Sequence, residues 1–128
     1  MKYLLIGHGS LAISVKKTVE FLIGQRDDLV AIDVNDESLA CQMIRDFTDQ
    51  WTDEGLVVFV DMAGSPVWTC CKELHFEKQF QLVCGYNIAM LLEILLAEKL
   101  SDDQLCELVE DIRGELIYVN DLIPPEYK

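Results

Sequence analysis

The segment Leu56–Val60 is an unbroken run of five apolar residues. A strand that is covered on both faces has this pattern, so we expect it near the centre of a parallel sheet. Other short apolar runs, at 3–6, 29–32 and 80–84, alternate with amphipathic stretches, which is typical of strands joined by crossover helices. The 128 residues match the common size of one domain. We therefore expect residues 1–128 to form a single α/β domain, a doubly wound, mostly parallel open sheet of about five strands with helices on both faces.

The expected helices have recognisable ends. The first helix starts at Leu11 and stops at Gly24, a suitable C-cap, with one face formed by Leu11, Val15, Val19 and Leu22. Asn35 or Asp36 caps the second helix. A further helix starts at Ser101 and ends at Gly114, after which residues 116–120 could add an edge strand.

The composition excludes several classes of protein. A net charge of −13 repels nucleic acids and anionic membrane surfaces, and it favours either simple solubility or a basic partner. No apolar stretch reaches the ~18–20 residues of a membrane span, and the apolar start is shorter than the ~7–15-residue core of a signal peptide. The five cysteines show no CxxC spacing, so we expect neither disulfides nor a zinc site but reduced, mostly buried thiols in a cytoplasmic protein.

In open α/β sheets the functional crevice lies beyond the carboxyl ends of the strands, where the strand order reverses. His8 follows the first expected strand, between two glycines and just before a helix, so its uncrowded imidazole suits a nucleophile. The other histidine, His75, lies in a polar run and reads as a surface residue. Asp61 ends the third expected strand, where it either accepts a hydrogen bond from His8 and fixes the tautomer or merely caps a turn.

Two further patterns leave alternatives open. Gly64-Ser65-Pro66 opens a helix and could offer backbone amides and a hydroxyl to a phosphate, but it is also an ordinary turn. The opening Gly7-His8-Gly9-Ser10-Leu11-Ala12 matches the dinucleotide fingerprint G-x-G-x-x-A through Gly7, Gly9 and Ala12, and Asp33 stands where a ribose-binding acid would lie.

Motifs along the whole chain resemble one family. These are Gly7-His8-Gly9 with Leu11-Ala12 and Gly24, then Asp53-Glu54-Gly55 before the apolar run, then Asp61-Met62-Ala63-Gly64-Ser65-Pro66, and finally the segment 84–93, CGYNIAMLLE. In this order they resemble the IIA components of the mannose family of the bacterial sugar phosphotransferase system, from Met1 to about Gly114. Nothing after Asp33 looks like a dinucleotide-binding enzyme.

The resemblance implies a function and a site. It implies four parallel strands, one antiparallel strand and a homodimer, with His8 as the phosphorylated histidine and Asp61 as its hydrogen-bonding carboxylate. Gly64 and Ser65 match the end of the phosphate-binding loop, and the amide of Gly9 adds to this cradle. The donor would be the histidine phosphocarrier protein HPr and the acceptor a IIB component, during sugar uptake. Positioning and charge stabilisation suffice for this transfer, so we expect no metal and no cofactor.

The sequence also departs from the family pattern. The loop after Asp61 is one residue shorter than usual, Val67-Trp68 replaces Phe-Asn, Ala89 replaces a proline, and Ser14 stands where glycine is common. These changes predict a reshaped phosphate cradle. A second class of function therefore stays open, a non-catalytic IIA-like module that regulates or binds a partner. The sugar is not encoded here, because sugar specificity lies in other components.

Overall fold

The computed structural model describes residues 1–51, 54–122 and 126. In these residues β1 (Lys2–His8), β2 (Leu29–Val34), β3 (Leu56–Val60) and β4 (Gln81–Cys84) form one parallel sheet in the order β2-β1-β3-β4. The order changes direction between β1 and β3, which defines the switch point of a doubly wound sheet. The expected α/β class and the adjacency of the first and third strands are confirmed.

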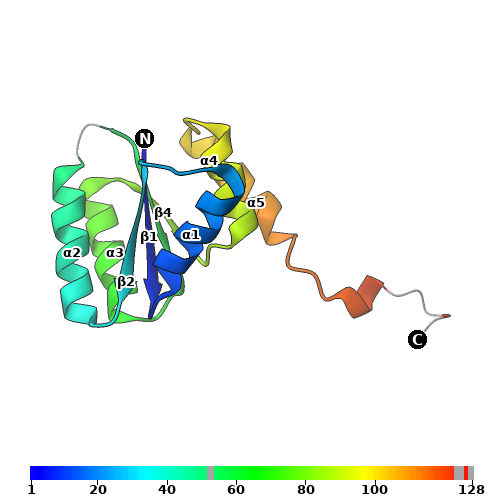
Figure 1. Ribbon diagram of the computed structural model, residues 1–128, viewed down its shortest axis with the longest axis horizontal. Helices are drawn as coiled ribbons and strands as arrows, with labels where there is room; N and C mark the ends of the chain where they lie inside the picture. The colour runs from blue at the N-terminus through cyan, green and yellow to red at the C-terminus, as the bar shows by residue number, and fades with distance from the viewer. Residues whose placement is uncertain (52–53, 123–125, 127–128) are drawn as a thin grey trace.

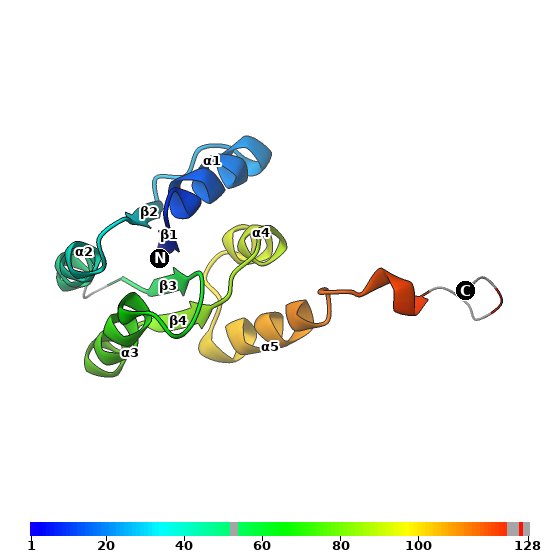
Figure 2. The same ribbon diagram turned by 90° about the horizontal axis from the view of Figure 1, so that it is seen from below.

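In the described residues there are five α-helices. They cover both faces of the sheet, as Figures 1 and 2 show. On one face lie α1 (Leu11–Ile23), α4 (Ile88–Ala97) and α5 (Asp102–Arg113), whose buried residues share a cluster with Tyr3, Leu5 and Phe59. On the other face lie α2 (Glu37–Gln50) and α3 (Pro66–Lys78), which pack on Leu4 and Ile6. Successive residues of β1 thus face opposite cores, which is the alternation expected of a strand covered on both sides.

The central strand and the helix caps follow the sequence predictions. All five residues of β3 are buried. Asp36 caps α2 by accepting the Leu39 amide, and Ser101 caps α5 in a reciprocal capping box with Gln104. Gly24 follows the last residue of α1 with a φ of 91°, a conformation that favours glycine.

Three details differ from the predictions. The buried residues of α1 are Ala12 and Val19, whereas Leu11 and Leu22 are exposed, because the helix packs on the sheet along a face rotated from the predicted one. The apolar pattern of residues 88–100 predicts one helix, but α4 ends at Ala97, before two residues with positive φ. Of the cysteines, only Cys70 and Cys71 are buried, and burial raises the pKa of both thiols to about 12.

The expected fifth strand does not form within the described residues. Residues 116–118 have no regular structure, and Val119–Leu122 form a short 3-10 helix, η1. After α5 the chain runs away from the sheet (Figure 1), so this apolar segment has no strand edge beside it. Its side chains are exposed, including Leu116 at 95% of its surface.

Candidate functional site

The carboxyl ends of β1 and β3 bring two distant residues together at the switch point. His8 is the last residue of β1, and Asp61 directly follows β3. The two strands pair in parallel from Lys2↔Leu56 to Ile6↔Val60, and the amide of Asp61 extends the pairing by donating to the carbonyl of Ile6 at 3.1 Å. Asp61 therefore lies beside His8 because the sheet register places it there.

Asp61 holds His8 through both its main chain and its ring. The His8 amide donates to Oδ2 at 2.9 Å, and the imidazole Nδ1 lies 3.0 Å from Oδ2 and 3.2 Å from Oδ1. The amide of Met62 donates to Oδ1 at 2.9 Å. The Asp61 side chain is only 10% exposed. The carboxylate is thus a fixed acceptor, and its hydrogen bond defines which way the ring faces.

The second ring nitrogen contacts a residue that the sequence analysis did not identify. Nε2 of His8 lies 2.9 Å from Oε1 of Glu37, the first residue of α2. The other oxygen of Glu37, Oε2, accepts the amide of Val67 at 3.0 Å, in the first turn of α3. In the sequence Glu37 only follows the expected cap at Asp36, and an acidic residue in the first turn of a helix is favourable in its own right. Only the docking of α2 beside β1 reveals its contact with His8.

The two carboxylates shift the titration of the imidazole. Hydrogen bonds to Asp61, first, and to Glu37, second, raise the pKa of His8, while partial burial opposes the rise. For Asp61, burial favours the neutral acid, but hydrogen bonds from the His8 amide, the His8 ring and Met62 outweigh it and lower its pKa. An ionised carboxylate only accepts hydrogen bonds, so Nδ1 carries a proton.

The residues expected to cradle a phosphate differ in whether their polar groups are already hydrogen-bonded within the protein. The Gly9 amide donates to the carbonyl of Val34 at 3.0 Å, so it is already paired. Ser65 is buried, and its hydroxyl oxygen accepts the Trp68 amide at 3.1 Å as the N-cap of α3. Gly64, with a φ of 90°, is exposed in the loop between β3 and α3. Among the described residues, the amides of Gly64 and Ser65 have no acceptor, whereas the Gly9 amide is paired.

Gly7 lies under the site at a close approach of three elements. A Cβ added there would stand 2.9 Å from the amide nitrogen of Ala12 and 2.9 Å from the hydroxyl of Tyr86. That hydroxyl donates to the carbonyl of Ile6 at 3.1 Å. Glycine at this position therefore lets α1 and the loop before α4 pack directly on the end of β1.

Asp33, from the dinucleotide-like pattern, and His75, the other histidine, both make contacts within the protein. Oδ1 of Asp33 accepts the amide of Ile13 at 3.0 Å, so the candidate ribose-binding acid is bound to α1. His75 is half-buried in α3, with Nδ1 at 2.5 Å from the carbonyl of Phe80. It lies near the amino end of the sheet rather than at the switch point.

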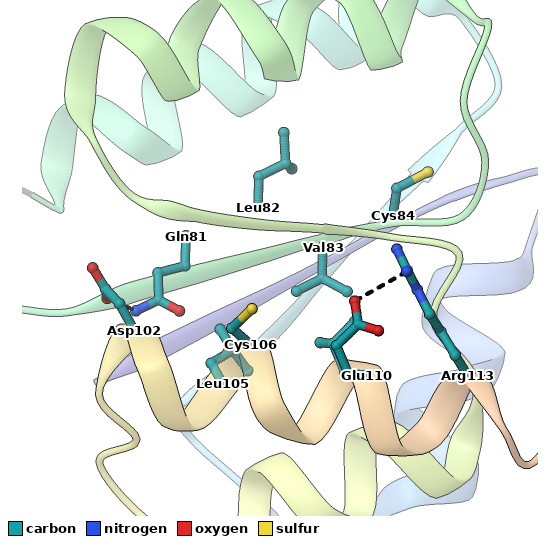
Figure 3. Close-up of a pocket in the computed structure, with 10 residues that line it drawn as sticks. Gln81, Leu82, Val83, Cys84, Asp102, Leu105, Cys106, Glu110 and Arg113 are labelled. Carbon is teal, nitrogen blue, oxygen red and sulfur yellow. Dashed lines mark hydrogen bonds and ion pairs between the residues drawn. The ribbon is translucent and has the colours of Figure 1, made fainter.

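A separate groove runs between β4 and α5 (Figure 3). Val83 and Leu105 line it together with charged residues of α5, where Glu110 and Arg113 form an ion pair at 3.0 Å. Neither His8 nor Asp61 lines this groove.

In the described part of the chain, no group of three or more His, Cys, Asp or Glu residues is arranged to hold a metal ion. Over the same residues, no helix has the length and apolar character required to cross a membrane.

The fold and the site together define a doubly wound α/β protein with a histidine-centred site at its switch point. The family model described as PTS system fructose IIA component (EIIA-man) matches residues 2–113. The chain therefore belongs to this family, the mannose-type IIA components of the sugar phosphotransferase system (PTS), and the predicted resemblance is confirmed.

Curated relatives agree with this family. The chain is 30% identical over 95 residues to the PTS system mannose-specific EIIAB component of Escherichia coli (strain K12) and to that of Shigella flexneri. The match covers 70% of this chain but 29% of those relatives, which are much longer proteins.

Solved structures share the fold at low sequence identity. A phosphoenolpyruvate-dependent sugar phosphotransferase system permease from Klebsiella pneumoniae superposes with a TM-score of 0.83 and 22% identity, covering 96% of this chain and 93% of the other. The mannose/sorbose specific IIA subunit from Enterococcus faecalis gives a TM-score of 0.77 and 17% identity, covering 91% and 92%.

Proposed function

We propose that this chain is a phosphoryl carrier that takes a phosphoryl group on Nε2 of His8. One observation carries the proposal: Asp61 binds Nδ1 of His8 and its main-chain amide, so Nε2 is the ring nitrogen that faces away from the sheet. Family membership supports the same chemistry. The proposed catalytic residues are His8, the nucleophile, and Asp61, which orients it and stabilises positive charge on the ring.

The proposed reaction is a transfer between two imidazoles. In the neutral ring with a proton on Nδ1, the electron pair of Nε2 attacks the phosphorus of the donor phosphohistidine. A P–N bond forms at His8 as the donor's P–N bond breaks, and its electron pair remains on the donor imidazole. The exposed loop at Gly64 and the amino end of α3 lie beside the site and can stabilise an anion there.

The partners follow from the family and remain proposals. We expect HPr as donor and a IIB component as acceptor during sugar uptake, which places the protein in the cytoplasm. The net charge of −13 favours a donor with a basic docking surface, since opposite potentials speed association.

A homodimer would cover the exposed apolar side chains of residues 116–122, among them Leu116 and Val119. Light scattering tests this, because the chain alone has a mass of 14.6 kDa.

The function is tested by incubating the protein with phosphoenolpyruvate, enzyme I and HPr. We expect one acid-labile phosphoryl group per chain, and none when HPr is left out. If wild type takes up no phosphate while a known IIA component does so in the same mixture, the regulatory or binding reading replaces the carrier.

A further inference from the structure

A carboxylate of this chain stands where the reacting phosphorus would have to approach. Oε1 of Glu37 is 2.9 Å from Nε2 of His8, on the side of the ring opposite Asp61. Oε2 binds the amide of Val67 at 3.0 Å. The ring nitrogen and a helix-terminal amide are also the two donors that a phosphoryl group bound at this place would meet. Among the residues that the structure describes, Glu37 alone contacts both.

We propose that Glu37 is a gating residue, whose carboxylate occupies the phosphoryl position of the unphosphorylated protein and must leave it before His8 can react. This inference rests on the proposed function. It assigns to Glu37 a positioning role, because it acts through the ring of His8. Its side chain is 35% exposed, so it has open solvent to move into.

The protonation of the ring supports this arrangement. Each imidazole nitrogen faces a carboxylate oxygen, and an ionised carboxylate accepts but does not donate, so both nitrogens carry protons. A doubly protonated ring has no electron pair with which to attack phosphorus. The two carboxylates raise the pKa of His8, which extends this inactive form to higher pH. Glu37 therefore blocks the ring both by its position and by its charge.

Other titratable groups near the ring do not take this role. On the β4 side lies Cys84, whose pKa is raised by burial and by the charge of Asp61. On the β2 side, Asp33 is bound to the amide of Ile13, and Asp36 to the amide of Leu39. On the α4 side, the hydroxyl of Tyr86 donates to a main-chain carbonyl. Within the described residues, only Asp61 and Glu37 bond to the ring.

Opening the gate can be written as a balanced step. The Nε2 proton passes to the carboxylate of Glu37, and the neutral acid turns away into solvent. The freed electron pair attacks the donor's phosphorus, and the donor's P–N bond breaks with its electron pair left on the donor imidazole. Glu37 then releases its proton to water, and the donor nitrogen takes one up. Transfer to the acceptor lets Glu37 return.

The test compares three variants with wild type. Glu37→Ala removes the carboxylate, and Glu37→Gln removes the charge but keeps an oxygen for the Val67 amide. Asp46→Asn is the matched control, because it removes one charge from the exposed face of the same helix. Three quantities are measured: the His8 pKa by NMR, binding of inorganic phosphate through the Val67 amide shift, and the rate of phosphorylation by phospho-HPr.

For Glu37→Ala we expect a lower His8 pKa, phosphate binding at least tenfold tighter at pH 7, and phosphorylation at least threefold faster. The gain in rate should shrink above the wild-type pKa of His8, where the ring is already neutral. Glu37→Gln should lower the pKa but still obstruct phosphate. Asp46→Asn should match wild type in all three measurements.

The outcomes separate the gate from the carrier. If wild type is phosphorylated and Glu37→Ala matches its pKa, phosphate affinity and rate, the gate is wrong and the carrier stands. If no variant accepts phosphate from HPr but Glu37→Ala alone binds inorganic phosphate at Val67, the carrier fails while Glu37 remains the occupant of an anion site. If Glu37→Ala is phosphorylated more slowly than wild type at pH 7, the gate is overturned.

Discussion

The carboxylate of Asp61 binds His8 at two points, the main-chain amide at 2.9 Å and the ring Nδ1 at 3.0 Å, although the two residues are 53 positions apart in the sequence. One acceptor thus fixes both the strand end and the orientation of the imidazole. Because the strands that deliver them pair directly, the relationship depends on the core of the sheet rather than on a flexible loop.

Replacing Asp61 by asparagine should lower the pKa of His8 and slow phosphoryl transfer. The change removes the negative charge that favours the protonated ring and replaces a charge-assisted hydrogen bond worth on the order of 1.5–3 kcal/mol. An NMR titration of both histidines in wild type and Asp61→Asn measures this, with His75 as the internal reference. Unchanged titration of His8 together with an unchanged transfer rate would reduce Asp61 to a cap at the strand end.

The stability of the protein should fall as pH rises through the folded-state pKa of His8. A group whose pKa is raised on folding stabilises the folded state fully below its unfolded value, about 6.5, and this contribution is lost as pH rises through the folded value. Urea unfolding of wild type from pH 6 to 9 should show this decline, and His8→Gln should lack it. Parallel curves for the two proteins would show that the ring is not coupled to the carboxylates.

The close approach at Gly7 makes a larger side chain costly there. In Gly7→Ala the new Cβ would stand 2.9 Å from the main chain of Ala12 and from Tyr86, so we expect a loss of about 1–3 kcal/mol in the free energy of unfolding. Gly114→Ala is the matched control, because its Cβ would meet its nearest neighbour at 3.5 Å, an ordinary contact. Equal stability of the two variants would contradict the packing described around Gly7.

Added NAD or NADP should leave the melting temperature unchanged. The groups with which the fingerprint would bind a dinucleotide already have partners in the protein. The Gly9 amide donates to the Val34 carbonyl, and the Asp33 carboxylate accepts the Ile13 amide. Binding at 100 times the dissociation constant would stabilise the protein by about 2.7 kcal/mol, a readily measured shift. A clear shift with either nucleotide would revive the dinucleotide reading.

The order of the strands and helices was predictable from the sequence, as was the contact between two candidate site residues, His8 and Asp61. Apolar runs and helix caps are local signals, so β3, the Asp36 cap and the Ser101 cap were predictable. We also expected β1 and β3 to be neighbours, and their pairing places Asp61 beside His8. From the sequence, Asp61 could either accept a hydrogen bond from His8 or cap a turn, and in the structure it lies within hydrogen-bond distance of the His8 ring.

The remaining features depend on how distant elements dock. In sequence Glu37 is an acidic residue in the first turn of a helix, and nothing local indicates that it faces His8. Residues 116–120 have a strand-like composition, but a strand needs an edge beside it, and the chain after α5 leads away from β4. For Gly64-Ser65-Pro66 the local alternative was an ordinary turn, and in the structure the Ser65 hydroxyl oxygen accepts the Trp68 amide at the start of α3.

The central claim, that His8 carries the phosphoryl group, is tested most directly by phosphorus NMR. Wild type, His8→Ala and His75→Ala are each treated with phosphoenolpyruvate, enzyme I and HPr, and the fold of each variant is checked by circular dichroism. We expect one resonance from a phosphoryl group bonded to Nε2 of a histidine in wild type and in His75→Ala, and none in a folded His8→Ala. A phosphohistidine signal that persists in His8→Ala would contradict it.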